Sequence, residues 1–210
     1  MSERGVFITG TDTDVGKTWV AARLIQKLRE SGVDAVGMKP IECGSYDDSD
    51  ALRAASGDAG LSREQINPIH LPDPLAPAAF SEVPEIDFAD LKQRFDDLAE
   101  AHDFVVVEGA GGWLVPVDET RTMADLAEQF ELPVVIVAAN RLGVLNHTLL
   151  TVRAILDSDL SCAGVFLNSL PDTSDLSCES NAKVLEKNLV EIPMIDQNLD
   201  PLVELCRRFS

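Results

Sequence analysis

GTDTDVGKT, residues 10–18, is the stretch that most strongly indicates the fold class of this chain. An apolar run, VFITG at residues 6–10, leads into it, and residues with helical spacing follow it. The phosphate-binding loop has the pattern G-x-x-x-x-G-K-[ST], which requires a glycine five residues before Gly16. Thr11 holds that position here, and the glycine stands one residue earlier, at Gly10. The stretch therefore predicts a phosphate-binding loop of a variant kind.

The position of this loop between a strand and a helix supports the prediction. A glycine-rich turn there points backbone N–H groups at a phosphate, and the helix dipole adds attraction for the anion. Lys17 would reach the β- and γ-phosphates of ATP, and the Thr18 hydroxyl would bind Mg²⁺. The alternative is an ordinary turn between strand and helix that happens to precede a lysine.

Outward from the loop, short apolar runs alternate with helical patterns, which predicts an α/β fold. We expect a P-loop NTPase-like parallel β-sheet with helices on both faces, built as a single domain over residues 1–210. The expected strands are residues 6–10, 35–40, 104–109, 132–140, 161–169 and 190–195. Helices are expected from residue 20 to Gly32, near 50–55, after an N-cap at Asp87, and near 201–209. Between residues 47 and 84 the pattern is otherwise irregular.

Composition narrows the partners and the compartment. The chain has 17 basic and 36 acidic residues, a net charge of −19, which argues against nucleic acid or an anionic membrane as partner. The N-terminal apolar run is too short for a signal peptide, and no run is long enough to span a membrane. The four cysteines show no C-x-x-C spacing, so neither a disulfide framework nor a zinc site is indicated. We expect a cytoplasmic protein.

Two charged residues stand where predicted strands end. Glu108 closes the run FVVVE and Lys39 follows AVGM, and ligands of open parallel sheets bind beyond the carboxyl ends of the strands. Glu108 would suit a metal ion there, or it could pair with a surface lysine. Lys39 would supply positive charge, or it could lay its stem on apolar surface with its head in water.

Several motifs together resemble the dethiobiotin synthetases, whose loop typically reads G-T-D-T-x-V-G-K-T. The resemblance covers most of the chain and adds KPIECG (39–44), SDA (49–51), VVEGAGGWLVP (107–116), LPVVIV (132–137), RLGVLNH (141–147) and EIP (191–193). Loop, EGAGGW and LGVLNH in this order are a specific combination.

The resemblance implies a role for each matching residue. Lys17 and Lys39 would be catalytic, and Mg²⁺ would be held by Thr18, Asp50 and Glu108, although Asp47, Asp48 and Asp50 by themselves are typical of a solvated acidic run. The implied ATP contacts are Thr13, Asp14, Val15, Gly16, Lys17, Thr18, Asp50, Glu108, Gly109, Ala110, Gly111, Asn168, Ser169, Pro193, Met194 and Ile195. The implied substrate contacts are Thr13, Cys43, Gly111, Gly112, Leu145 and Asn146.

The resemblance also implies a reaction. Members of the family convert 7,8-diaminopelargonic acid and CO₂ into dethiobiotin, with ATP giving ADP and phosphate, in biotin biosynthesis. A carbamate of one amine attacks the γ-phosphate, and the second amine opens the resulting anhydride. The family acts as a homodimer whose active sites lie at the interface. Two departures affect how the substrate is positioned: Asp14 stands where the family usually has Glu, and Cys43 stands where serine is frequent.

Two alternative functions remain open on the sequence. A partition or positioning ATPase shares the broad fold, but its loop G-K-G-G-x-G-K-T carries a second lysine, and Asp12, Thr13 and Asp14 stand in that region here. A related ATP-dependent ligase or amidase acting on another carboxylate would use the same machinery. Dependence of ATP turnover on the diamine and CO₂ separates the three functions.

Overall fold

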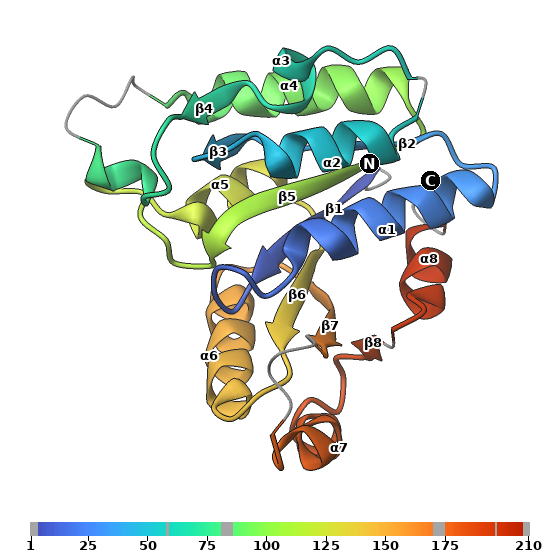
Figure 1. Cartoon of the computed structure of the whole chain (residues 1–210), viewed down its shortest axis with the longest axis vertical. Helices are drawn as coiled ribbons and strands as arrows, with labels where there is room; N and C mark the ends of the chain where they lie inside the picture. The colour runs from blue at the N-terminus through green and yellow to red at the C-terminus, as the bar shows by residue number, and fades with distance from the viewer. Residues whose placement is uncertain (1–3, 58, 81–85, 170–174, 196, 208–210) are drawn as a thin grey trace.

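The computed structural model of the chain (Figure 1) describes residues 4–57, 59–80, 86–169, 175–195 and 197–207. Its described strands are β1 (Gly5–Gly10), β2 (Ala35–Met38), β3 (Ile41–Cys43), β4 (Ile69–Leu71), β5 (Phe104–Gly112), β6 (Val134–Ala139), β7 (Cys162–Asn168) and β8 (Met194–Ile195). Its described helices are α1 (Lys17–Glu30), α2 (Asp47–Ala55), α3 (Arg63–Ile66), η1 (Pro77–Ala79), α4 (Phe88–Ala101), α5 (Met123–Phe130), α6 (Val144–Asp157), α7 (Cys178–Asn188) and α8 (Asp200–Cys206).

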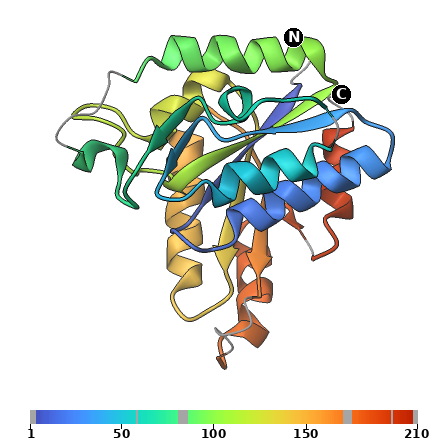
Figure 2. The ribbon, with the colours of Figure 1, turned by 45° about the horizontal axis from the view of Figure 1, so that its top comes forward.

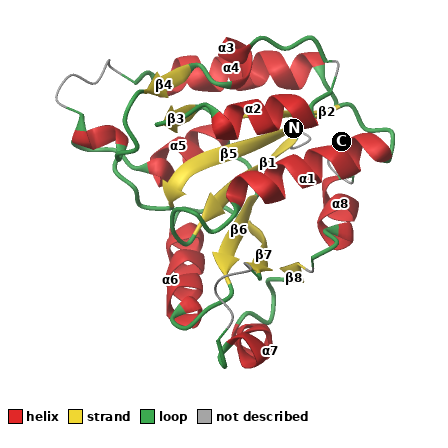
Figure 3. Ribbon diagram, viewed as in Figure 1, coloured by secondary structure: helices red, strands yellow, loops and turns green. Residues whose placement is uncertain are grey.

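Among the described residues, six strands form one sheet in the order β2-β5-β1-β6-β7-β8, and every pairing is parallel. Parallel neighbours need crossover connections, and the helices supply them, as Figure 3 shows with helices in red and strands in yellow. The α/β prediction is confirmed by this architecture.

Helices cover both faces because side chains alternate along each strand. Val6 and Ile8 face the helices α1, α2 and α8, whereas Phe7 between them faces the side of α4 and α5. β5 and β6 alternate in the same way, so their continuous β-branched runs are buried on both faces. Figure 2 shows β1 and β5 lying between α4 on one side and the pair α1 and α2 on the other.

Several boundaries differ from the expectation. The helix expected near residues 50–55 begins earlier, at Asp47. The helix expected near 201–209 is α8, which ends at Cys206 with Arg207 as its C-cap, and residues 208 and 209 lie outside the described part. The strand expected at 190–195 contains only Met194 and Ile195, because Pro193 has no N–H to enter the ladder. Residues 81–84 of the segment expected to be irregular also lie outside the described residues.

A small second sheet lies inside the segment expected to be irregular. β3 pairs in parallel with β4, with Ile41 opposite Ile69 and Cys43 opposite Leu71. Three-residue strands are too short to show an alternating pattern, so no periodicity in the sequence predicts them. β3 begins two residues after Lys39 and β4 leads into residues 74–77, so the pairing fixes these two segments relative to each other.

Among the described helices, none is long and apolar enough to cross a membrane.

Candidate functional site

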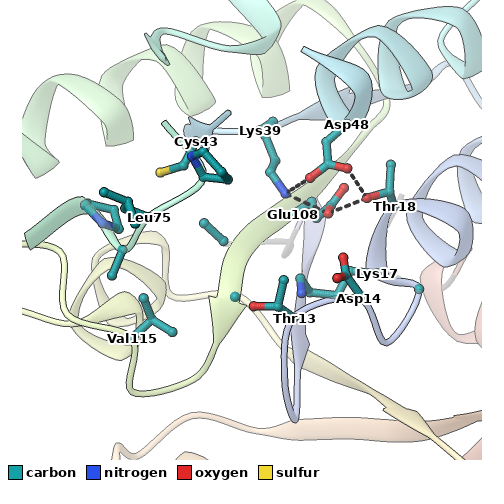
Figure 4. A pocket seen from close by; sticks show the side chains of 16 residues that line it. Thr13, Asp14, Lys17, Thr18, Lys39, Cys43, Asp48, Leu75, Glu108 and Val115 are labelled. Atoms are coloured by element: carbon teal, nitrogen blue, oxygen red, sulfur yellow. Dashed lines mark hydrogen bonds and ion pairs between the residues drawn. The ribbon is translucent and has the colours of Figure 1, made fainter. Parts of the chain in front are cut away.

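A pocket of about 500 Å³ opens at the carboxyl ends of the central strands (Figure 4). Three neighbouring strands reach it, because β5 lies between β2 and β1 in the sheet. The pocket is lined by Thr13, Asp14, Gly16, Lys17, Thr18, Lys39, Cys43, Asp48, Pro74, Leu75, Ala76, Pro77, Glu108, Ala110, Gly111 and Val115. Most of the loop, lysine and acid residues predicted from the sequence therefore meet in one place.

The loop at residues 10–18 has the backbone that a phosphate requires, and it explains the early glycine. A Cβ on Gly10 would lie 2.7 Å from the Asp12 carbonyl oxygen and 2.9 Å from a Val15 methyl, so only glycine fits. Thr11 instead donates its N–H to the Val137 carbonyl in the neighbouring strand. Gly16 has φ +96° and is the N-cap of α1, which leaves the first N–H groups of that helix facing the loop.

Lys17 lies under this loop. Its ammonium donates to the Asp12 carbonyl at 3.1 Å, and the side chain is almost fully buried. Burial lowers the pKa of Lys17, and repulsion from the Lys39 ammonium lowers it further. An incoming phosphate would offset both effects, because its negative charge adds to the attraction from Glu108, Asp48 and Asp14 that already favours the ammonium form.

Four side chains from four segments form a polar cluster at one wall of the pocket. The Lys39 ammonium lies 2.7 Å from a carboxylate oxygen of Glu108 and 2.7 Å from one of Asp48. The Thr18 hydroxyl lies 2.6 Å from Asp48 Oδ1 and 2.9 Å from Glu108 Oε1. Figure 4 shows these contacts as dashed lines. We call Thr18, Lys39, Asp48 and Glu108 the acid–lysine cluster.

Strand register explains why residues so distant in sequence meet here. Met38 is paired with Val107, so Lys39, one residue later, comes opposite Glu108. Ile8 is paired with Glu108 on the other edge of β5, which brings the loop after β1 to the same carboxylate. Lys39 and Glu108 are 69 residues apart, and the hydrogen bond between them follows from the order of the strands.

The charges of the cluster stabilise one another. Burial alone would lower the pKa of Lys39, but the carboxylates of Glu108 and Asp48 outweigh it and raise that pKa, so the side chain stays an ammonium. Partial burial opposes ionisation of Asp48, yet Lys39 holds the pKa of that carboxyl below its ordinary value. Complete burial raises the pKa of Glu108, and Lys39 counteracts this shift.

The oxygen atoms of this cluster fit a small hard cation. Thr18, Asp48 and Glu108 bring a hydroxyl and two carboxylates together, which is the donor set that Mg²⁺ prefers. Glu108 Oε2 is buried and has no hydrogen-bond partner among the described residues, so one oxygen remains available. Within the described part of the chain, no group of three or more His, Cys, Asp or Glu side chains has the arrangement of a metal site.

The structure does not bring Asp50 into this cluster, contrary to the expectation that it would hold the metal. Its carboxylate pairs with Arg63 at 2.8 Å, and both side chains are nearly half exposed. Asp48 occupies the place expected for Asp50. Residues two apart on a helix point about 200° away from each other, so only one of the two can face the pocket. The buried Leu52 and Ala55 were the available signal, since Asp48 lies four and seven residues before them.

One wall of the pocket was missed from the sequence. The segment from Pro74 to Pro77 and the side chain of Val115 line it with apolar surface. Gly44 donates its N–H to the Leu71 carbonyl, which fixes the end of β3 beside the start of this segment. Cys43 lies on the same side, and partial burial raises the pKa of its thiol, so it is a neutral, weak donor.

The glycine-rich end of β5 divides between two hollows. Ala110 and Gly111 line the pocket, whereas Gly112 lines a neighbouring hollow of about 380 Å³ beside Thr13 and α6. Gly109 is buried against the ring of Phe7, and its carbonyl accepts from the Lys39 ammonium at 3.2 Å. Gly111, with φ +64°, lets the chain run close to whatever fills the pocket.

The remaining predicted residues lie outside the pocket. Val15 is buried, and its carbonyl accepts a hydrogen bond from the Asn168 side chain at 2.9 Å. Ile195 packs in the core on the α1 side, Met194 points to the opposite face, and Ser169 and Pro193 are exposed. Leu145 and Asn146 lie in the first turn of α6, Leu145 half-buried and Asn146 exposed.

Comparison with known proteins identifies the family. A family model described as an AAA domain matches residues 4–198. The ATP-dependent dethiobiotin synthetase BioD of Akkermansia muciniphila is 41% identical over 186 residues, which cover 88% of this chain and 87% of that protein. The protein of the same name from Methanococcus vannielii is 36% identical, over 95% of this chain and 97% of that protein. The one from Anaeromyxobacter dehalogenans is 46% identical, over 85% of this chain and 82% of that protein. The chain belongs to the dethiobiotin synthetase family.

Solved structures of other proteins align with this member of the dethiobiotin synthetase family and confirm its fold, but they do not test its activity. The hydrogenase maturation factor HypB from Archaeoglobus fulgidus aligns with a TM-score of 0.58 over the whole chain and 91% of that protein, at 14% identity. A ParA family ATPase from Chlorobium tepidum aligns with a TM-score of 0.54 over 99% of this chain and 89% of that protein, at 16% identity. Identities this low support the P-loop NTPase architecture alone.

Proposed function

We propose that this protein is an ATP-dependent dethiobiotin synthetase, a ligase of biotin biosynthesis. It would join 7,8-diaminopelargonic acid and CO₂ into a cyclic urea while ATP becomes ADP and phosphate. The observation that carries the proposal is the meeting of the loop 10–18 with Lys39 and Glu108 in one pocket, in a chain of this family.

The two lysines answer the main difficulty of the reaction, which is to bring a carbamate anion to a triphosphate. Lys17 lies under the loop that would hold the phosphates, and the Lys39 ammonium lies near enough to lower the pKa of Lys17. Because the pKa of Lys39 is raised, this residue acts as a fixed positive charge and not as a base. Both ammonium groups would stabilise the charge that spreads over the transferred phosphoryl group.

Thr18, Asp48 and Glu108 would hold Mg²⁺ together with the phosphates of ATP. The ion, when bound, neutralises phosphate charge and orients the phosphoryl group. The protein's own contribution is to keep both carboxylates within hydrogen-bond distance of the Thr18 hydroxyl and to anchor them on Lys39.

The wall opposite the lysines suits the diamine. Leu75, Pro77 and Val115 present apolar surface for its alkyl chain, and Cys43, Thr13 and Gly111 offer polar or close backbone contacts near the reacting amines. Fixing both amines beside the phosphate supplies much of the remaining rate enhancement. No nucleophile from the protein is needed.

The base of ATP would lie toward the ends of β7 and β8. Asn168 ends β7, Ser169 follows it, and residues 193–195 include β8, while the Asn168 side chain donates to the Val15 carbonyl. The Asn168 carbonyl also accepts a backbone hydrogen bond from Asn140, so its position is fixed before any nucleotide binds. We propose these residues as the base contacts.

We propose a homodimer in which Leu145 and Asn146 reach the partner's substrate. The supporting observation is the apolar surface around them: Leu142, Leu150 and Leu156 are 81%, 58% and 52% exposed. Leu150 and Leu156 lie on α6 and Leu142 lies just before it, and exposed apolar side chains gathered in one region are typical of an interface. The acidic chain would work in the cytoplasm, without nucleic acid or membrane as partner.

The test is phosphate release from ATP with Mg²⁺ in reactions that contain or lack the diamine and bicarbonate. Release is expected only when both are present, and Lys17→Ala should abolish it. Equal ATP hydrolysis without the diamine would instead favour the partition-type ATPase, which shares this fold. Dependence on a different carboxylate would favour a related ligase.

A further inference from the structure

Glu42 is a buried carboxylate that lies beside the pocket without lining it. It is the middle residue of β3, between Lys39 and Cys43, and only 2% of its surface is exposed. Its Oε1 accepts two backbone hydrogen bonds, from the N–H of Asp48 at 2.9 Å and from the N–H of Ser49 at 3.1 Å. Glu42 therefore contacts the backbone of the residue that completes the acid–lysine cluster.

These two bonds are the N-terminal cap of α2. The residue at the N-cap position, Tyr46, makes no side-chain capping bond, so the first N–H groups of the helix would be unpaired without Glu42. A cap from a separate strand fixes more than the helix end, because it sets how the helix is rotated and how far it slides along its axis. That rotation decides whether Asp48 or Asp50 faces the pocket.

The other carboxylate oxygen of Glu42 is not used by any group in the described part. Oε2 is buried and has no hydrogen-bond partner there. A buried carboxylate with one unpaired oxygen is an unfavourable way to cap a helix, and Asp, Ser or Thr at the N-cap itself does the same at the surface. Capping by Glu42 has a clear benefit only at the acid–lysine cluster, because it holds Asp48 and Ser49, the second and third residues of α2, against β3.

We propose that Glu42 is a positioning residue for metal binding: through the backbone of Asp48 it holds that carboxylate against Thr18 and Lys39. This inference rests on the proposed function, since it assigns Asp48 to the Mg²⁺ site. Groups that orient a metal ligand typically change metal affinity by roughly 10–100-fold when they are removed. Because Glu42 acts through a backbone N–H and not on the carboxylate itself, we expect the lower end of this range, about tenfold.

Two substitutions of nearly equal size separate the cap from the charge. Glu42→Gln removes the charge and keeps an oxygen that can accept both N–H groups. Glu42→Met removes the charge and the acceptor together. Asp87→Ala is the matched control, because Asp87 caps α4 with two bonds of the same kind, from the N–H of Ala89 and of Asp90, and α4 contributes nothing to the pocket.

The readout is the affinity for a non-hydrolysable ATP analogue, measured by calorimetry with Mg²⁺ and again with a chelator. The ratio of the two affinities is the gain due to the metal. Glu42→Met should reduce this gain by about tenfold, Glu42→Gln should keep most of it, and Asp87→Ala should keep all of it despite a lower melting temperature. Affinity without metal should be nearly unchanged in all three.

A folded Glu42→Met protein with the full metal-dependent gain would overturn the inference, as would an equal loss in Asp87→Ala. If Glu42→Met does not fold, Glu42→Asp replaces it: the charge stays but the carboxylate is one methylene short, and the gain should fall while Glu42→Gln keeps it. A wild-type protein with no metal-dependent gain would overturn the Mg²⁺ site itself. That result differs from one in which wild type shows the gain and the Glu42 variants show it equally, which overturns only the role of Glu42.

Discussion

Asp48 and Asp50 offer a direct test of the site, because family resemblance selects one of them and the structure selects the other. Both lie in the first turn of α2, so Asp48→Asn and Asp50→Asn remove the same charge from the same helix end. Their surroundings differ. Asp48 contacts Thr18 and Lys39, whereas Asp50 contacts Arg63 and Arg53 at the surface.

The expected magnitudes follow from these contacts. The Asp50 and Arg63 side chains are 44% and 45% exposed, and such surface pairs contribute about 1 kcal/mol or less, so Asp50→Asn should be nearly silent. Asp48→Asn removes a charged hydrogen bond at a carboxylate that is 39% exposed, while Lys39 keeps Glu108. We expect a loss of about 1–2 kcal/mol, which lowers the melting temperature by about 2–8 °C in a chain of this size.

The difference in turnover should be much larger. Asp48→Asn should reduce diamine-dependent phosphate release by about 10² or more, the scale for losing a charge-stabilising group, and Asp50→Asn should stay within about twofold of wild type. Both variants are assayed at saturating ATP across a series of Mg²⁺ concentrations, after their folding is checked by circular dichroism. Loss of activity in Asp50→Asn with near-normal activity in Asp48→Asn would refute the assignment drawn from the structure.

Four further predictions concern other residues. Lys39→Gln leaves Glu108 and Asp48 without their shared cation, so steady-state assays should show turnover reduced by about 10² or more, and near-normal turnover would make Lys39 a mere structural lysine. Cys43→Ser should retain or improve activity, because a hydroxyl is a better donor than a neutral thiol, and an inactive variant would mean that the thiol has another role. If each site is shared between two chains, a mixture of the Lys17→Ala and Asn146→Ala proteins should recover roughly a quarter of normal activity. The control is that Asn146→Ala alone is folded, dimeric and impaired. No recovery after verified subunit exchange would then exclude a shared site. The N–H of Thr120 and the Arg121 side chain lower the pKa of Asp118 to about 2, so the folded state binds fewer protons than the unfolded state, and this stabilisation is present above about pH 4 and lost toward pH 2. The melting temperature of Asp118→Asn should therefore differ from that of wild type at pH 7 and approach it as the pH falls. A difference that grows in acid would contradict this sign.

The fold class and the phosphate loop could be predicted from the sequence alone, because both depend on neighbours along the chain. Continuous β-branched runs such as residues 134–137 indicate strands buried on both faces, and the helical spacing after Thr18 indicates a crossover helix. The variant loop was recognisable for the same reason, since Gly10, Gly16 and Lys17 act within a few residues of each other. Glu108 and Lys39 were candidates because each stands near the end of an expected strand, and the family resemblance supplied the role of Lys39.

Long-range packing, by contrast, determines that Asp48 is the acid that contacts Lys39, and it forms the walls of the pocket. The choice of Asp48 over Asp50 depends on the rotation of α2 about its axis, which is set by Leu52 packing against Gly37 of β2 and by the bonds from Glu42. The sequence of α2 contains both acids in one turn and cannot say which face is buried until its partner is in place. The wall at residues 74–77 likewise follows from the pairing of β3 with β4, whose strands are too short to leave a pattern. Contacts of this kind join segments through strand order and helix packing, and no local periodicity records them.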